Sequence, residues 1–147
     1  MKKIILSFAL ILAVGASSFA SGIERNPVEQ NFAKQFAGAE FVKWSSVEDL
    51  QKATFILAGI RTEAYYNQDG ELLGSLRNLF YTQLPLSVMQ TLNSKFEGAV
   101  VIEIMEISNL EGTSYKIVLE QKDKKYSTRI TNTGEVVSKT KIKAAKA

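Results

Sequence analysis

Residues 26–44 read NPVEQNFAKQFAGAEFVKW, and residues 85–99 repeat the pattern as PLSVMQTLNSKFEGA. In both segments three apolar side chains stand four positions apart, and a glycine follows shortly after the last of them. The first set is Val28, Phe32, Phe36 and Gly38, and the second is Val88, Leu92, Phe96 and Gly98. Apolar residues with this spacing share one face of an α-helix, and glycine is typical of a helix end. Asn26 and Pro27 are typical of a helix start. The spacing therefore predicts one amphipathic helix in each of two similar halves.

Sequence typical of β-strands follows each predicted helix. In residues 115–120, apolar side chains alternate with polar ones, as in an antiparallel strand with one face in the core and one in water. The other predicted strands are residues 41–44, 53–58, 62–66 and 71–73 in the first half, and 100–107, 126–131 and 135–137 in the second. Turns at Gly70 and Gly134 place the last two strands of each half in hairpins.

The fold class that follows is α+β. Each half contains one helix and a four-stranded antiparallel meander, and together they form a sheet of about eight strands with the helices on one face. Repeat one is predicted over residues 26–80 and repeat two over residues 84–141. The offset between matched positions changes from 60 in the helices to 64 at Gly70 and Gly134, which indicates two small loop insertions. Residues 74–83 join the halves, either as a last strand or as a crossing connection, and a strand edge nearby could accept a peptide.

The first twenty residues have the three parts of a secretory signal peptide. Two lysines precede an apolar run over residues 4–14, and small residues follow, with Ser18 and Ala20 in the cleavage positions. The alternative is a membrane anchor, but a spanning helix needs about 20 apolar residues and this run has 11. We therefore expect a signal peptide over residues 1–20 and a periplasmic or secreted domain over residues 21–147, without a stable membrane anchor after cleavage.

The composition limits the chemistry of the chain. Its 147 residues, 46% hydrophobic and 22% charged, fit one globular domain. Without cysteine or histidine it lacks the usual groups for thiol nucleophiles, imidazole bases and zinc binding. Glu103 and Glu106 lie three residues apart on a predicted strand, so they point to opposite faces and cannot share an acid–base site. We expect no enzyme activity, no catalytic residue, no cofactor and no metal site, and for an exported chain no nucleic-acid partner.

A family resemblance spans residues 27–137. The motifs that carry it are FAGAEFVKW at 36–44, ATF at 53–55, AYYNQDGEL at 64–72 and LP at 84–85. With these motifs the chain resembles the PepSY-like proteins exported by Bacteroidetes, whose tandem helix-and-meander units are similar to the β-lactamase inhibitory protein. The resemblance implies an exported, non-enzymatic binding or inhibitor-like module with a concave sheet face, formed by residues 21–147. It carries over the architecture and no target-binding residue, since the inhibitory protein contains disulfides and this chain has no cysteine.

Aromatic residues are the best candidates for a binding site. Tyr65 and Tyr66 are adjacent on a predicted strand, so one points to the core and the other to the open sheet face. Phe80 and Tyr81 are expected to repeat this arrangement near Arg77. Tyrosine and arginine on a wet surface commonly anchor protein interfaces, although single exposed aromatic residues are also common without such a role. The candidate partner-binding residues are therefore Tyr65, Tyr66, Arg77, Phe80 and Tyr81, and the expected partner is an envelope protein or peptide.

Other interpretations stay open at the level of sequence. The chain could carry a small apolar ligand between helices and sheet, which needs a cavity of about 300 Å³ or more, whereas a binding module has a filled core. Trp44 is expected in such a core, under a helix. The lysine-rich residues 122–143 could attract phosphates or anionic lipid, or could form a solvated edge strand that lysines protect from aggregation. An open edge also allows either a monomer or a dimer.

Overall fold

The structure is a computed structural model that describes residues 26–143, and the predicted signal peptide lies outside these residues. Helix α1 (Pro27–Gln35) begins the first half, and helix α2 (Leu86–Lys95) begins the second. Four strands follow α1: β1 (Glu40–Val47), β2 (Leu50–Leu57), β3 (Ile60–Tyr66) and β4 (Leu72–Asn78). Four strands follow α2: β5 (Val100–Asn109), β6 (Gly112–Gln121), β7 (Lys124–Thr131) and β8 (Val136–Lys141). A short 3-10 helix, η1 (Tyr81–Gln83), precedes α2. Within residues 26–143, no helix is long and apolar enough to cross a membrane.

All eight strands form one antiparallel sheet in the order of the sequence, which confirms the predicted α+β fold. The pairing also shows which face the helices cover. Thr62 is buried opposite Phe55 beneath α1, and on its other side it is opposite Arg77. Arg77 is opposite Glu106, and Glu106 is opposite Tyr115, which is buried beneath α2. Because directly opposite residues point to the same side of a sheet, α1 and α2 cover one face.

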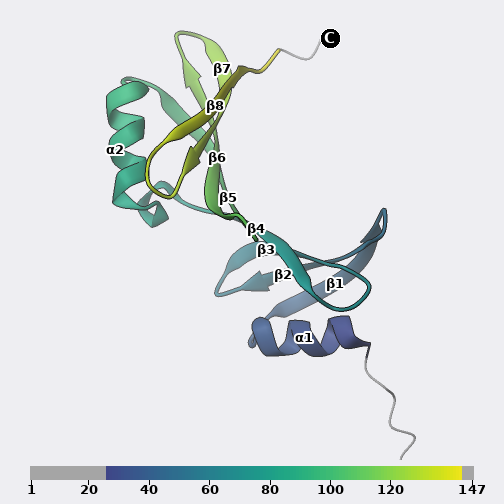
Figure 1. Ribbon diagram of the computed structural model, residues 1–147. Helices are drawn as coiled ribbons and strands as arrows, with labels where there is room; N and C mark the ends of the chain where they lie inside the picture. The colour runs from purple at the N-terminus through teal and green to yellow at the C-terminus, as the bar shows by residue number, and fades with distance from the viewer. Residues whose placement is uncertain (1–25, 144–147) are drawn as a thin grey trace, which may run out of the picture.

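The sheet bends where its two halves meet. In Figure 1, α2 lies to the left of the second half and α1 lies beneath the first half. The helix-free surfaces of the two halves therefore turn toward each other on the right of the view. We call this helix-free side of the sheet the open face and the other side the helix face.

The four extra residues of the second half lie in one place. Val47 is opposite Leu50 beside the β1–β2 turn, and the matched residues of the second half, Ile107 and Ser114, are also opposite each other. The β5–β6 hairpin then continues for two further pairs before its turn. The prediction of two loop insertions is therefore wrong, because one hairpin extension accounts for the change in offset. Residues 108–109 of this extension form two of the five β4–β5 pairs that join the halves.

Each helix is tied to the last turn of its own half at a glycine. Asn31 of α1 donates a hydrogen bond to the carbonyl oxygen of Gly70 over 2.7 Å, and Thr91 of α2 donates one to Gly134 over 2.6 Å. The two glycines have positive φ angles, +85° and +91°. A Cβ atom on them would lie only 2.9 Å and 2.8 Å from the backbone of the helix above. At both positions the turn conformation and the close approach of the helix backbone therefore exclude residues other than glycine.

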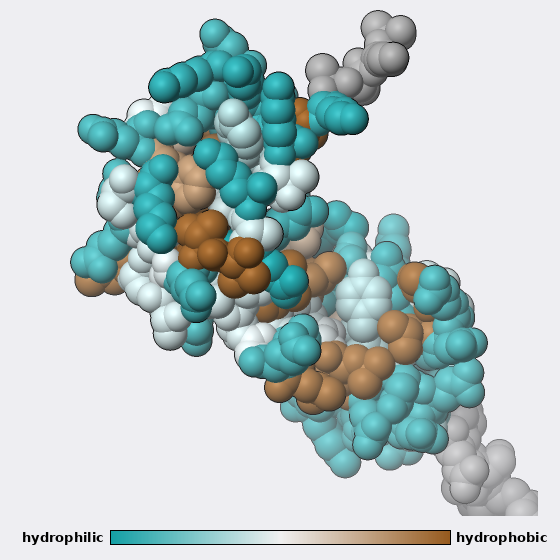
Figure 2. Space-filling view, turned by 45° about the horizontal axis from the view of Figure 1, so that its top comes forward, coloured by the Kyte–Doolittle hydropathy of each residue, from teal (hydrophilic) through white to brown (hydrophobic). Residues whose placement is uncertain are grey.

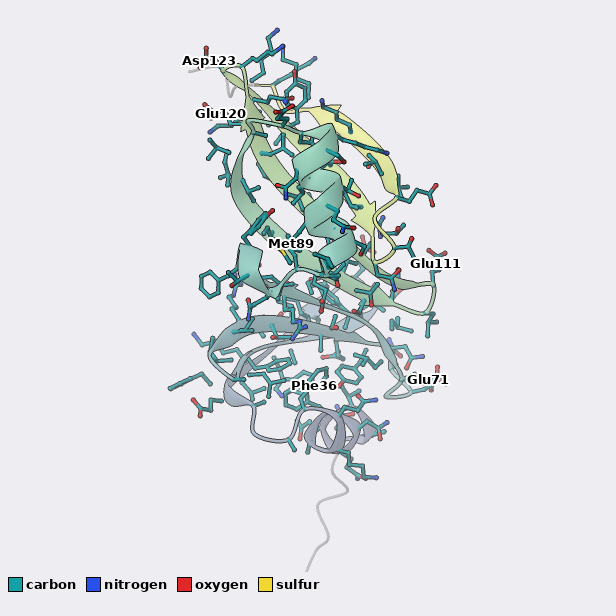
Figure 3. The ribbon with its side chains drawn as sticks, turned by 90° about the vertical axis from the view of Figure 1, so that its left-hand side faces the viewer. Phe36, Glu71, Met89, Glu111, Glu120 and Asp123 are labelled. Carbon is teal, nitrogen blue, oxygen red and sulfur yellow. The ribbon has the colours of Figure 1, made fainter. Side chains whose placement is uncertain are left out.

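Different side chains fill the two cores. The first is rich in aromatic rings, and Phe32 packs edge-on against Phe55 with ring centroids 4.9 Å apart. Figure 3 shows Phe36 between α1 and the sheet. The second core is mainly aliphatic and contains Leu79, Leu84, Val88, Leu92, Ile104, Ile117, Leu119 and Ile130, with Phe96 and Tyr115. Trp44 lies on the helix face 5.2 Å from the Phe32 ring, but it is 37% exposed because β1 is an edge strand.

Candidate interaction surface

The structure separates the adjacent tyrosines Tyr65 and Tyr66. Tyr66 is fully buried on the helix face, and its hydroxyl donates a hydrogen bond to Oε1 of Gln35 over 2.8 Å. Burial raises the pKa of Tyr66 to about 12. Tyr66 is therefore a core residue that cannot contact a partner, which corrects its place among the candidate residues. The alternation of side chains along β3 leaves Tyr65 on the open face.

Arg77 lies on the helix face, where it contacts Glu106 of the other half. Its guanidinium makes two hydrogen bonds to the Glu106 carboxylate, at 2.6 Å and 3.3 Å, and Tyr115 donates a third at 3.2 Å. The hydrogen bond from Glu106 raises the pKa of Arg77, and burial together with Glu106 raises the pKa of Tyr115. Glu103 is opposite Val118 on the open face, so the two glutamates lie on opposite faces as predicted. Arg77 thus joins β4 to β5 and is turned away from Tyr65.

Phe80 and Tyr81 lie in the connection between the halves. Residues 74–83 form a strand as far as Asn78 and then lead into η1, so they combine the two predicted alternatives. Phe80 and Tyr81 do not repeat the arrangement of a core residue beside a surface residue, because the chain has left the sheet. They are 75% and 38% exposed. The Tyr81 hydroxyl donates to Oδ1 of Asn93 over 3.3 Å, which places Tyr81 beside α2.

A charged cluster holds Tyr65 on the open face. The Tyr65 hydroxyl donates a hydrogen bond to Oε2 of Glu63 over 2.9 Å. Arg61 donates to the other carboxylate oxygen over 2.9 Å, and Nζ of Lys52 lies 3.9 Å from Oε2. Burial and the hydrogen bond to Glu63 raise the pKa of Tyr65 above its ordinary value. Glu63 therefore fixes the tyrosine side chain, which stays partly exposed.

An apolar strip lies next to Tyr65 and crosses the junction of the halves. Leu76 is opposite Glu63 on one side and Ile107 on the other, and Met105 continues the strip along β5. The three side chains are half-buried by their sheet neighbours. A hollow of about 170 Å³ is lined by Tyr65, Leu76 and Ile107, among others. Figure 2 shows apolar patches in both halves with hydrophilic side chains around them. We name Tyr65, Glu63, Leu76, Met105 and Ile107 the junction patch.

Four of these five residues, all except Tyr65, are not among the binding residues predicted from the sequence. One signal was available, since alternation along residues 60–66 places Arg61, Glu63 and Tyr65 on one face. Leu76 and Ile107 carry no such signal, because they belong to different halves and meet only through the β4–β5 pairing.

Comparisons with known proteins identify the architecture. No family model matches the chain, and no curated protein matches it. A solved BLIP-like protein from Bacteroides fragilis has a TM-score of 0.71 and 18% identity over 82% of this chain and 87% of its own. A candidate periplasmic protein from Bacteroides eggerthii has a TM-score of 0.70 and 21% identity over 80% of this chain and 88% of its own. A DUF2874 family protein from Bacteroides ovatus has a TM-score of 0.70 and 21% identity over 80% and 86%. At these identities the similarity shows the fold: the chain has a BLIP-like fold.

Proposed function

We propose that the chain is an exported, non-enzymatic, PepSY-like module that binds an envelope protein through its open face. The observation that carries the proposal is the junction patch, in which a fixed tyrosine borders an apolar hollow on the side without helices. Glu63 already holds the Tyr65 side chain in one position, so little side-chain conformational entropy is lost when a partner binds. Less of the favourable binding free energy is therefore offset. Leu76 and Ile107 offer half-exposed apolar surface beside it. The candidate periplasmic neighbour supports the export part of the proposal.

A carrier of small apolar ligands has less support. Such a carrier needs a cavity of about 300 Å³ or more between helix and sheet. The hollow between α2 and the sheet, lined by Leu92, Phe96 and Leu119 among others, has about 160 Å³. A filled core with an accessible aromatic patch favours contact with another macromolecule.

Site-specific crosslinking tests the proposed binding face. A photoreactive amino acid replaces Tyr65 in the exported protein, and a matched protein carries it in place of Tyr81 beside α2. We expect a defined protein adduct from position 65 in the cell envelope, and we expect the adduct to be lost when Leu76→Ser is added. An adduct from position 81 alone would place the interface elsewhere. A bound lipid or metabolite in native mass spectrometry, without an adduct, would favour the carrier.

Export is tested independently of binding. We propose that residues 1–20 are removed as a signal peptide. The protein isolated from the periplasm should begin at Ser21, as N-terminal sequencing can measure. A protein that begins at Met1 and stays in the cytoplasm would contradict both the export and an envelope partner.

A further inference from the structure

The charge of the described chain is divided between two regions. Residues 26–121 contain seven basic and twelve acidic residues, whereas residues 122–143 contain seven basic and two acidic residues. The described chain as a whole is thus balanced, and its positive charge is concentrated in β7, β8 and the adjoining turn. A local excess of this kind produces a positive potential at one end of the molecule.

The lysines lie at the open end of the β7–β8 hairpin, where β7 begins and β8 ends, away from the turn that joins the two strands. Lys124, Lys125, Lys141 and Lys143 line a hollow of about 930 Å³ together with Ile142, Glu120 and Asp123. A hydrogen bond of 2.8 Å from the Ile142 amide to the carbonyl oxygen of Lys125 holds the strand ends together. Figure 3 shows Glu120 and Asp123 at the end of the molecule furthest from α1. We define the lysine tip as Lys122, Lys124, Lys125, Lys141, Ile142 and Lys143.

The lysines of this tip are exposed and free of ion pairs. Among residues 26–143, the ion pairs within 4 Å involve only Lys52, Arg61 and Arg77 as cations. Lys139, two positions before Lys141 on β8, differs from the tip lysines, because its ammonium group lies 4.4 Å from the centroid of the Tyr126 ring. A solvated edge strand, the alternative considered from the sequence, needs charged side chains but no exposed apolar side chain. Ile142 is 39% exposed in the middle of the tip and provides apolar surface there.

We propose that the lysine tip docks the protein on the surface of an anionic lipid bilayer. Phosphate headgroups complement the five exposed ammonium groups of the tip, and clusters of this size are attracted to anionic membrane surfaces. Ile142 and the lysine stems can contact the apolar part of the interface. A nucleic acid would call for stacking platforms, but the residues that line the hollow include no aromatic side chain. The site is separate from the junction patch, so it can hold the protein at a membrane while the open face stays accessible.

Vesicle binding by the exported chain tests this proposal. The probes are vesicles of phosphatidylcholine with one quarter phosphatidylglycerol, vesicles of phosphatidylcholine alone and a single-stranded oligonucleotide. The variant Lys124→Gln/Lys141→Gln/Lys143→Gln should bind the anionic vesicles on the order of a hundredfold more weakly than the unchanged chain. The control Lys34→Gln/Lys43→Gln/Lys95→Gln has the same net charge as the tip variant, and its affinity for the anionic vesicles should fall far less. Circular dichroism verifies that both variants stay folded.

The outcomes separate the lysine tip from general electrostatic attraction. Binding that requires phosphatidylglycerol, weakens at high salt and depends on the lysine tip supports the proposal. Equal losses in the two triple variants, or equal binding to both kinds of vesicle, would overturn it. Binding of the oligonucleotide without binding of the anionic vesicles would also overturn it. Because crosslinking at position 65 reports on the open face, either proposal can fail while the other holds.

Discussion

The two halves of the sheet have the same architecture but different cores. Phe32, Phe55 and Tyr66 of the first half occupy the positions that Leu92, Leu119 and Ile130 occupy in the second. Aromatic rings fill one space and branched aliphatic side chains the other, yet both halves keep the helix stripe and the glycine turn. The difference shows that the repeat tolerates changes of core shape as long as the space is filled, whereas the close helix-to-turn contact allows little variation.

The halves also differ in the polar and charged groups that they carry. The first core contains a polar tie, the hydrogen bond between Tyr66 and Gln35, while Ile130 at the matched position has no hydroxyl. The second half carries the lysine tip at its free end. Both halves share the β4–β5 boundary, where Arg77 and Glu106 form the ion pair between them.

The largest effect should come from the aromatic core. Phe55 is 1% exposed and its ring packs 4.9 Å from the rings of Phe32 and Phe36. Phe55→Ala should lower the free energy of unfolding by about 3–5 kcal/mol, because a large buried ring leaves a cavity. Chemical denaturation measures the loss, with Leu119→Ala as the matched aliphatic variant.

Hydrogen exchange in the Phe55→Ala variant shows whether the halves unfold together. The continuous sheet across β4–β5 leads us to expect that amides of β6 and β7 lose protection along with those of β2. If the second half kept its full protection, the two cores would be independent units and the shared sheet would contribute little to cooperativity.

A smaller effect should come from the glycine turns. Gly134→Ala should cost about 2–4 kcal/mol, since it combines a left-handed backbone with a Cβ that meets α2. Gly98→Ala provides the control, because Gly98 has a φ of +73° and nothing within 4 Å of an added Cβ. It should cost about 1–2 kcal/mol. Thermal unfolding of both variants isolates the helix contact, and equal losses would show that the contact adds nothing.

Removal of the polar tie in the first core should have an effect of about 1 kcal/mol. Tyr66→Phe deletes the hydroxyl that bonds Gln35 and keeps the ring. The pKa of about 12 lies above the ordinary 10.0, so the folded protein holds this proton more tightly than the unfolded chain does. The contribution of this pKa shift to the free energy of unfolding is complete below pH 10 and is lost as the pH rises toward 12.

Unfolding measured between pH 10 and pH 12 checks the alkaline part of this prediction. Stability should fall more steeply in the unchanged chain than in Tyr66→Phe. Tyr65 and Tyr115 are present in both proteins, so they do not affect the comparison. Equal slopes would show that Tyr66 does not ionise differently in the folded and unfolded states.

The smallest effect should come from the boundary between the halves. Arg77→Ala removes a two-bond contact with Glu106 and should cost about 0.5–1 kcal/mol at low salt. Arg61→Ala, which removes an exposed pair within the first half, should cost less. Denaturation at low and high salt compares them. An equal loss in the two variants would mean that the boundary pair has no special weight.

Much of the fold could be predicted from the sequence. The spacing of Val28, Phe32 and Phe36 identifies a helix, and Gly70 and Gly134 identify equivalent turns. The candidate site could be predicted only in part, because the predicted set combines Tyr65 with Tyr66 and Arg77, which the structure places on the other face. The expectation for Phe80 and Tyr81 failed for a related reason: it assumed that the strand continued beyond Asn78.

The sequence by itself determined the local elements and the tandem repeat, because helix stripes, strand alternation and turn glycines act within short segments. Tertiary structure decided the rest. It placed the four extra residues in one hairpin, brought Leu76 next to Ile107 and set Arg77 against Glu106. These contacts depend on strand register between different segments of the chain, and register is set by which side chains are buried and by turn geometry.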